Sequence, residues 1–303
     1  MVLMVETSPI RIGTRKSALA MVQAQQVIAA LAVACEIIPI ISSGDKVAGP
    51  LRDHGGKSLF TKELDLALLQ GEIDLAVHSM KDVETPLPEA LEIAAVPDRE
   101  DPREVLITNP CLKQENFETG MTIGTSSLRR AHQLTLHYPN ITIMPCRGNI
   151  QTRLQKYSNR DFDGIILALA GLKRMEIFNN GIIEGIQANV QVLDINKYIP
   201  APGQGALVVV KRTNDHRFND ILKIVNHPDS LLAIQIERAV VDALNLTCHD
   251  PVGVYSKVSG NEFFVNFILF TAHGFVEQMI QGPLENQQQL IQDFVERVSK
   301  FRR

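Results

Sequence analysis

The chain has 303 residues, of which 45% are hydrophobic and 21% charged, and it carries a formal net charge of -4. This length predicts two or three domains, and the negative charge argues against a nucleic-acid binder. The first residues lack a signal-peptide pattern, and no apolar run is long enough to cross a membrane. The four cysteines are scattered and form no CxxC pair, which argues against a disulfide framework and against a zinc site.

Strand and helix patterns alternate through the first hundred residues. The strand "RIGT" leads into the helix "SALAMVQAQQVIAAL", whose apolar residues fall on one face, and the buried strand "EIIPII" follows. A second helix, "TKELDLALLQG", stops at Gly71, and "IDLAVHS" and "LEIAAVP" are further strands. This β-α-β order predicts an α/β domain with a mostly parallel sheet.

A second unit with the same alternation begins near Asp101. Its strands and helices are predicted in "REVLIT", "MTIGTSSLRRAHQL", "ITIMPC" and "DGIILALAGLKRM". The stretches "RIGTRKSALA" and "TIGTSSLRRA" both run from a strand through a Gly-Thr turn into a helix. This internal echo predicts two α/β lobes that are built alike.

The remainder of the chain, from about Asn219, has a different pattern. A helix, "SLLAIQIERAVVDAL", precedes three alternating strands at hairpin spacing, and a final helix, "LENQQQLIQDFVERVSKF", follows. The segment "PAPGQGALVVV" lies before this part, and its Pro and Gly content is typical of a crossing loop. We therefore expect a small C-terminal α+β domain.

Arginines recur where the predicted strands end. Arg11 and Arg15 flank the first strand-to-helix turn, and Arg129 and Arg130 follow the turn "GTSS"; the later strand ends are followed by Arg147, Arg153 and Arg174. Ligands of open α/β sheets bind beyond the carboxyl ends of strands, and the first N–H groups of a helix favour an anion. The pattern predicts an acidic small ligand, with ordinary helix caps and solvated arginines as the alternative.

The loop "AVHSMKDVETP" ends another predicted strand and offers Lys81 and Asp82. An aspartate beside a lysine and near arginines stays ionised, so Asp82 could stabilise a developing cation or pass a proton. The alternative is a surface loop with a helix cap.

The sequence "LTCHDPV" sets Cys248, His249 and Asp250 in a row. Neighbours in the chain cannot face one another as a catalytic triad, whose members come from distant positions. A passive thiol and a thiolate that forms one covalent bond both remain open, and a metal ligand is poorly supported.

Taken in order and spacing, these motifs resemble the porphobilinogen deaminase (hydroxymethylbilane synthase) family. The resemblance covers roughly residues 10–256. It rests on the stretches "RIGTRKSALA", "GGKSLFTKEL", "DLAVHSMKDV", "REDPRE", "IGTSSLRRAHQL", "RGNIQTRL", "LALAGLKR" and "PAPGQGAL".

The resemblance implies a transferase that joins four porphobilinogen molecules head to tail, with release of ammonia, into the linear tetrapyrrole hydroxymethylbilane of haem biosynthesis. It implies two α/β domains like the bilobal periplasmic binding proteins, over residues 1–100 with 199–218 and over residues 101–198, and a small α+β domain over residues 219–303. The first domain would hold the catalytic aspartate loop. Residues 45–60, which are rich in Gly and charge, are predicted to form a mobile lid in the same domain. The protein is expected to be cytoplasmic and monomeric, with no metal, membrane or nucleic-acid partner.

The resemblance also implies residue roles. Asp82 matches the catalytic aspartate, and Cys248 matches the cysteine that holds a dipyrromethane cofactor through a thioether. The positions that match cofactor-binding residues are Lys81, Ser127, Arg129, Arg130 and Arg153. Those that match substrate-side residues are Arg11, Arg15, Ser17, Arg147 and Arg174.

The chain departs from the family pattern just before the cysteine, where Leu246 and Thr247 replace two glycines. If those glycines have positive φ, Leu and Thr would be strained there. Glu84 also replaces a common proline near Asp82. Two alternative functions are a non-catalytic bilobal binder of polycarboxylates on the same fold, and a cysteine hydrolase, which rests only on the Cys-His-Asp order.

Overall fold

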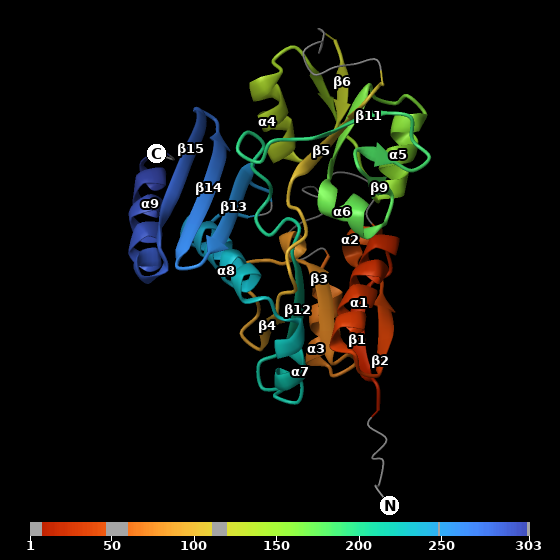
Figure 1. Cartoon of the computed structure of the whole chain (residues 1–303), viewed down its shortest axis with the longest axis vertical. Coiled ribbons are helices and arrows are strands. Elements are labelled where there is room, and N and C mark those ends of the chain that lie inside the picture. The colour runs from red at the N-terminus through yellow and green to blue at the C-terminus, as the bar shows by residue number, and fades with distance from the viewer. Residues whose placement is uncertain (1–7, 47–59, 111–119, 248, 302–303) are drawn as a thin grey trace, which may run out of the picture. The chain divides into compact units, whose positions relative to one another are not determined.

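The computed structural model describes residues 8–46, 60–110, 120–247 and 249–301, and the chain divides into two compact units. The first unit combines residues 1–98 with 207–228, and the second combines residues 99–206 with 229–303. Figure 1 shows their elements coloured along the chain. No helix among the described residues is long and apolar enough to span a membrane.

The first unit is built on a sheet with strand order β2-β1-β3-β12-β4. The strands are β1 (Ile10–Arg15), β2 (Cys35–Ile40), β3 (Leu75–Ser79), β4 (Leu91–Ala95) and β12 (Leu207–Arg212). The helices are α1 (Ala18–Leu31), α2 (Ser43–Lys46), α3 (Lys62–Leu69) and α7 (Asn219–Val225), with a 3-10 turn η2 (Met80–Asp82). Ala24, Val27 and Leu31 of α1 pack with buried strand residues in one apolar core, as the predicted helical face requires.

The second unit contains a sheet with strand order β11-β5-β8-β6-β7. Its strands are β5 (Glu104–Thr108), β6 (Thr122–Gly124), β7 (Thr142–Met144), β8 (Gly164–Ala168) and β11 (Asn189–Val192), and β9 (Phe178–Asn179) and β10 (Ile182–Ile183) form a small hairpin. Its helices are α4 (Leu128–His137), α5 (Ile150–Ser158) and α6 (Leu169–Arg174). Alternate residues of β5 and β8 belong to two separate cores, one shared with α5 and α6 and the other with α4.

The two sheets have the same topology. Strands β2, β1 and β3 run parallel in the first sheet, as do β7, β6 and β8 in the second. The next strand, β12 or β5, is antiparallel to its neighbours in both sheets. The strand-turn-helix stretches of the internal echo are therefore equivalent elements, β1–α1 and β6–α4, and the prediction of two α/β lobes built alike is confirmed.

The C-terminal part of the second unit is a three-stranded antiparallel sheet with helices on it. Its elements are α8 (Pro228–Ala243), β13 (Val252–Ser259), β14 (Glu262–Thr271), β15 (Gly274–Pro283), η4 (Leu284–Asn286) and α9 (Gln287–Phe301). Buried residues of α8, α9 and all three strands share one apolar core, with the Phe267 and Phe294 rings edge to face at 5.1 Å. The predicted α+β architecture is confirmed.

The start of this C-terminal part differs from the predicted residue 219. Helix α7 belongs to the first unit, because Leu222 and Val225 pack in the core of α1 and its sheet. The chain joins the C-terminal core only from Asp229 onward.

Two chain segments at the crossings are fixed within the second unit. The Arg99 side chain donates to both carboxylate oxygens of Glu237 on α8, which is fully buried, and to the carbonyl of Gln204. The Glu237 carboxylate also accepts from the N–H groups of Gly203 and Ser256. Residues 99–102 and 203–206 are thereby tied to the C-terminal part.

Candidate active site

In the first unit, two strand ends bring Arg15 and Asp82 together. Arg15 is the last residue of β1, and the turn η2 follows β3, which pairs with β1 in parallel. Arg15 Nη1 lies 3.7 Å from Asp82 Oδ2, and the Arg15 guanidinium lies 4.2 Å from the centre of the Phe60 ring. Both charged side chains remain partly exposed, at 22% and 31%. The site therefore holds an accessible carboxylate next to a fixed cation.

Further polar residues lie near the same ends of β1 and β3. Ser17 caps α1 by accepting a hydrogen bond from the N–H of Ala20, and Lys81 is half-buried on η2. His78 is buried, and desolvation together with the Arg15 charge lowers its pKa to about 4. His78 is therefore neutral at physiological pH.

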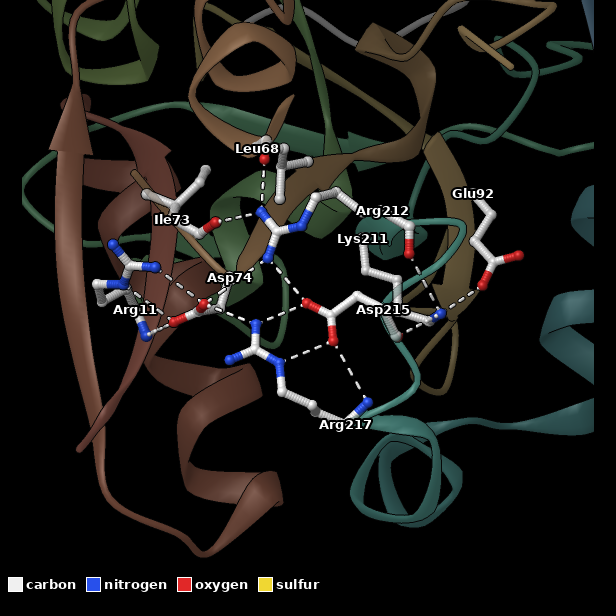
Figure 2. A network of polar contacts seen from close by, with 9 residues as sticks. All are labelled: Arg11, Leu68, Ile73, Asp74, Glu92, Lys211, Arg212, Asp215 and Arg217. Atoms are coloured by element: carbon white, nitrogen blue, oxygen red, sulfur yellow. Dashed lines mark hydrogen bonds and ion pairs between the residues drawn. The ribbon is translucent and has the colours of Figure 1, made fainter. Parts of the chain in front are cut away.

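Arg11 lies at the other end of β1, away from the predicted ligand edge. Its guanidinium and its backbone N–H bind the Asp74 carboxylate at 3.0–3.1 Å. Figure 2 shows that Asp74 also meets Arg217, which joins it to Asp215. These contacts hold the pKa of both carboxylates below the ordinary range. The structure thus gives Arg11 a structural partner and does not bring it to Arg15.

In the second unit, two helices begin at neighbouring parallel strand ends. Helix α4 follows β6, and its first turn is capped by Ser127, which accepts from the N–H of Arg130. Helix α5 follows β7 and is capped by Asn149, which accepts from the N–H of Thr152. Because both helix N-termini point their N–H groups toward the same edge, this edge favours negative charge.

Arg147 and Arg153 lie in the turn between β7 and α5 and in the first turns of α5. Arg153 Nε donates to the carbonyl of Gly148 at 2.8 Å, and Lys156 Nζ donates to the carbonyl of Arg147 at 3.3 Å. Both arginines are half-buried. They add positive charge to the edge where α4 and α5 begin.

Arg129 and Arg130 are buried and bind a carboxylate of the protein itself. Arg130 grips Glu104 with Nε at 3.0 Å and Nη2 at 2.8 Å, and Arg129 Nη2 donates to the same carboxylate. Burial lowers the pKa of Arg129, and the charge of Glu104 opposes this. Glu104 was not predicted as a site residue, although an acidic residue at the start of the apolar strand β5 is a signal that indicates a buried charge.

Arg174 lies at the end of α6, a helix turn beyond the end of β8. Its Nη2 donates to the carbonyl of Gly205 at 2.7 Å, and burial lowers its pKa to about 10. Arg174 therefore contacts the segment that contains Gly205.

Cys248 lies outside the described residues, but its neighbours show whether Leu246 and Thr247, which replace two glycines of the family pattern, have positive φ. The positive φ of this loop, 49°, is at Asn245, just after α8. The N–H of Leu246 donates to the carbonyl of Val241 and Leu246 is buried in the C-terminal core, which is the Schellman helix ending. Thr247 N–H and Oγ1 then both donate to Asp250 Oδ2, at 2.7 and 2.9 Å. The expected strain at Leu246 and Thr247 is thus absent from the described part of this loop.

Two further expectations concern other parts of the chain. Most of the predicted lid at residues 45–60 lies outside the described residues. Among the residues that the structure does describe, no group of three or more His, Cys, Asp or Glu side chains could hold a metal ion.

Comparisons with known proteins agree on one family. A family model described as "Porphobilinogen deaminase, dipyromethane cofactor binding domain" matches residues 10–220. The chain is 41% identical over 257 residues to "Porphobilinogen deaminase" from Paenibacillus macerans, covering 82% of this chain and 77% of the relative. It is 38% identical over 268 residues to "Probable porphobilinogen deaminase" from Nitrosopumilus maritimus, covering 87% and 83%.

The similar solved structures have a lower sequence identity to this chain than these relatives have. The second substrate binding domain of a putative amino acid ABC transporter from Streptococcus pneumoniae aligns with a TM-score of 0.45 at 11% identity, covering 78% of this chain and 95% of that one. The periplasmic VFT2 domain of BvgS from Bordetella pertussis aligns with a TM-score of 0.41 at 14% identity, covering 77% and 91%.

Proposed function

The chain belongs to the porphobilinogen deaminase family, and from that premise we propose which of its residues carry the reaction. The enzyme is a transferase of tetrapyrrole biosynthesis with a dipyrromethane cofactor binding domain. Each porphobilinogen carries an acetate and a propionate, and loss of its ammonia leaves an electron-poor methylene-pyrrole cation. The protein must therefore bind several carboxylates and stabilise one developing cation.

Asp82 is the catalytic residue of this proposal. Its carboxylate is partly exposed at the carboxyl ends of β1 and β3, and Arg15 lies 3.7 Å away. A carboxylate held in this way can stabilise the methylene-pyrrole cation and accept a hydrogen bond from a pyrrole N–H. Arg15 both orients Asp82 and offers a guanidinium to a substrate carboxylate, with Ser17 and Lys81 beside it. The Arg15–Asp82 pair is the observation that carries the assignment.

The strand-end donors of the second unit fit the carboxylates of a dipyrromethane. The donors are the N-termini of α4 and α5 and the side chains of Ser127, Arg147 and Arg153. Guanidinium groups and helix N-termini both favour carboxylates. Arg129 and Arg130 lie in the first turn of α4 beside them. When bound, the cofactor supplies the primer to which the pyrroles are added. These residues would hold its acetate and propionate groups in place.

Cys248 is the attachment residue of this proposal, and its thioether would tether the cofactor to the second unit. The described neighbours support this assignment because Thr247 and Asp250 hold the chain on both sides of the cysteine. We further propose a cytoplasmic monomer with no metal, membrane or nucleic-acid partner, organised as two α/β domains and one C-terminal domain.

Intact mass spectrometry tests the cofactor assignment. The purified protein should exceed its sequence mass by one dipyrromethane, and Cys248→Ser should have the sequence mass alone. A wild-type protein of bare sequence mass that releases no ammonia from porphobilinogen would support a non-catalytic binder of polycarboxylates instead. Hydrolysis of esters or amides that is lost on thiol blocking would support a cysteine hydrolase.

Replacement of the catalytic carboxylate tests the role of Asp82. Asp82→Ala should lose nearly all turnover while it keeps the cofactor mass, because the residue acts on the reacting cation and not on attachment. Asp220→Asn is the matched control, since Asp220 is exposed and its carboxylate forms an ion pair with Lys223, which is also exposed. Turnover in Asp82→Ala equal to that of the control would refute the assignment.

A further inference from the structure

We propose that Glu104 is a positioning residue for cofactor binding, which fixes the orientation of Arg129 and Arg130 and leaves this cluster with one net positive charge for one ligand carboxylate. The inference rests on the proposed role of the two arginines in holding the cofactor. It gives a role to Glu104, the last residue of the stretch "REDPRE", to which neither the motif pattern nor the family match assigns one.

The contacts of Glu104 engage both arginines at once. Glu104 is the first residue of β5, and only 1% of it is exposed. Its Oε1 accepts from Arg129 Nη2 and from Arg130 Nε, and its Oε2 accepts from Arg130 Nη2. One carboxylate thus sets the positions of two neighbouring guanidinium groups, one of them bidentately.

Backbone carbonyls complete the cage around the guanidinium groups. Arg130 Nη1 donates to the carbonyl of Ile166 on β8 at 3.2 Å, and Arg129 Nη1 donates to the carbonyl of Ile199 at 2.9 Å. Gln133 donates to the same Ile199 carbonyl at 2.9 Å. Each guanidinium is therefore held from two sides, so neither side chain can swing freely to meet a ligand.

The charges of the cluster set what it can bind. Two guanidinium groups and one carboxylate leave one net positive charge, in a place where Arg129 and Arg130 are only 5% and 7% exposed. Without Glu104, two buried like charges would repel each other, and only the carbonyls of Ile166 and Ile199 would hold their donors. Ser127 caps the same helical turn, so this charge lies at the strand end where α4 begins.

A charge-only role and a positioning role for Glu104 predict opposite results. If charge alone mattered, Glu104→Gln would add one positive charge and would load a polycarboxylate cofactor faster. If Glu104 positions the two arginines, the same change would slow loading, because the amide cannot bind two guanidinium groups in the same geometry. The direction of the effect therefore separates the two roles.

The experiment follows loading of apo-protein, prepared from cells that cannot make porphobilinogen. Wild-type apo-protein is incubated with porphobilinogen, and the gain in intact mass is followed in time. Misplaced binding groups cost roughly tenfold to a hundredfold in rate, so Glu104→Gln should load at least about tenfold slower than wild type. Glu104→Asp keeps the charge and should recover part of the rate.

Asp74→Asn is the control, because Asp74 is also a nearly buried carboxylate held by arginines but lies in the first unit. It should lower thermal stability as Glu104→Gln does and load at the wild-type rate. Loading of folded Glu104→Gln at the control rate, or faster, would overturn the proposal. If Glu104→Gln does not fold, Glu104→Asp decides, and loading at the wild-type rate would overturn it. Failure of wild type to gain mass would instead count against the proposed function.

Discussion

Burial shifts the pKa values of two side chains of the first unit, His78 and Asp65, in opposite directions. As a result, these two groups make the stability depend on pH in opposite ways. Burial and then the Arg15 charge lower the pKa of His78 from 6.5 to about 4. Burial raises the pKa of Asp65 from 3.8 to about 6, opposed by Thr61 and supported by the charge of Glu84. His78 is therefore buried as a neutral ring, and Asp65 keeps its proton to a higher pH in the folded protein than in the unfolded chain.

The pH dependence of unfolding should separate these two groups. Between pH 6.5 and 4 the unfolded chain binds the extra proton at His78, so stability falls as the pH falls, by up to roughly 3 kcal/mol for a shift of this size. Between pH 3.8 and 6 the folded protein binds the extra proton at Asp65, so this contribution falls as the pH rises. Urea unfolding across this range should show a steeper loss toward acid for Asp65→Asn than for wild type. His78→Asn should show a shallower loss, and identical profiles for all three proteins would contradict both assignments.

At the scale of elements, the packing of residues 99–102 against residues 203–206 leaves no room for a side chain at Gly205. Its φ is +88°, and a Cβ there would lie 2.2 Å from the carbonyl oxygen of Glu100. The Gly205 carbonyl also accepts from Arg174 and from the N–H of Glu100. The segment 203–206 therefore packs backbone to backbone against residues 99–102.

Gly205→Ala should consequently destabilise the second unit by more than about 2 kcal/mol, because strain at positive φ adds to a clash with backbone. Gly185→Ala is the control, since Gly185 has a φ of +73° but an added Cβ would meet nothing within 4 Å. It should cost only about 1 kcal/mol. Equal losses in denaturant unfolding would show that the contact with Glu100 is unimportant.

At the end of α8, the backbone conformation of one residue, Asn245, determines how the helix ends. Asn245 has the left-handed conformation, and the N–H groups of Asn245 and Leu246 donate to the carbonyls of Asp242 and Val241. Asn245→Ala should lower the unfolding free energy by about 1 kcal/mol, whereas Asn245→Gly should match or exceed wild type. Urea denaturation of the two variants measures this. A loss in the glycine variant as large as in the alanine variant would rule out the proposed helix ending.

At the scale of the whole molecule, ion pairs join distant parts of the chain. Asp74 is 63 residues from Arg11 and 143 residues from Arg217, and it binds both. Arg212 adds hydrogen bonds to the carbonyl of Ile73 and to Asp215. As Figure 2 shows, these contacts tie β1 and the start of β3 to the end of β12 and the turn that follows it.

Asp74→Ala should lower the stability of the first unit by about 2 kcal/mol, since Asp74 is nearly buried and several donors lose their acceptor together. Asp220→Ala, which removes an exposed pair with Lys223, should leave the stability of this unit nearly unchanged. Thermal unfolding at two salt concentrations measures both. Equal effects would mean that the network contributes no more than a surface pair.

The sequence predicted most of the fold because its signals are local. Apolar periodicity predicted α1, and the Gly-Thr echo predicted the equivalence of β1–α1 and β6–α4. Partners distant in the chain were not predictable in this way. Nothing near Arg130 indicates Glu104, 26 residues earlier, and nothing near Arg11 indicates Asp74. Similarly, the apolar face of α7 does not reveal which core will cover it.

The order of strands in the two sheets has a consequence for the emerging polypeptide on the ribosome. In the first sheet β12 lies between β3 and β4, although it is made after every strand of the second α/β sheet. The earlier strands of the first sheet thus wait, with the edges of β3 and β4 unpaired, while more than a hundred further residues are translated, from 99 to 206. The sheet synthesised second can close first, and the nascent N-terminal part completes its fold only after residues 207–212 have left the exit tunnel.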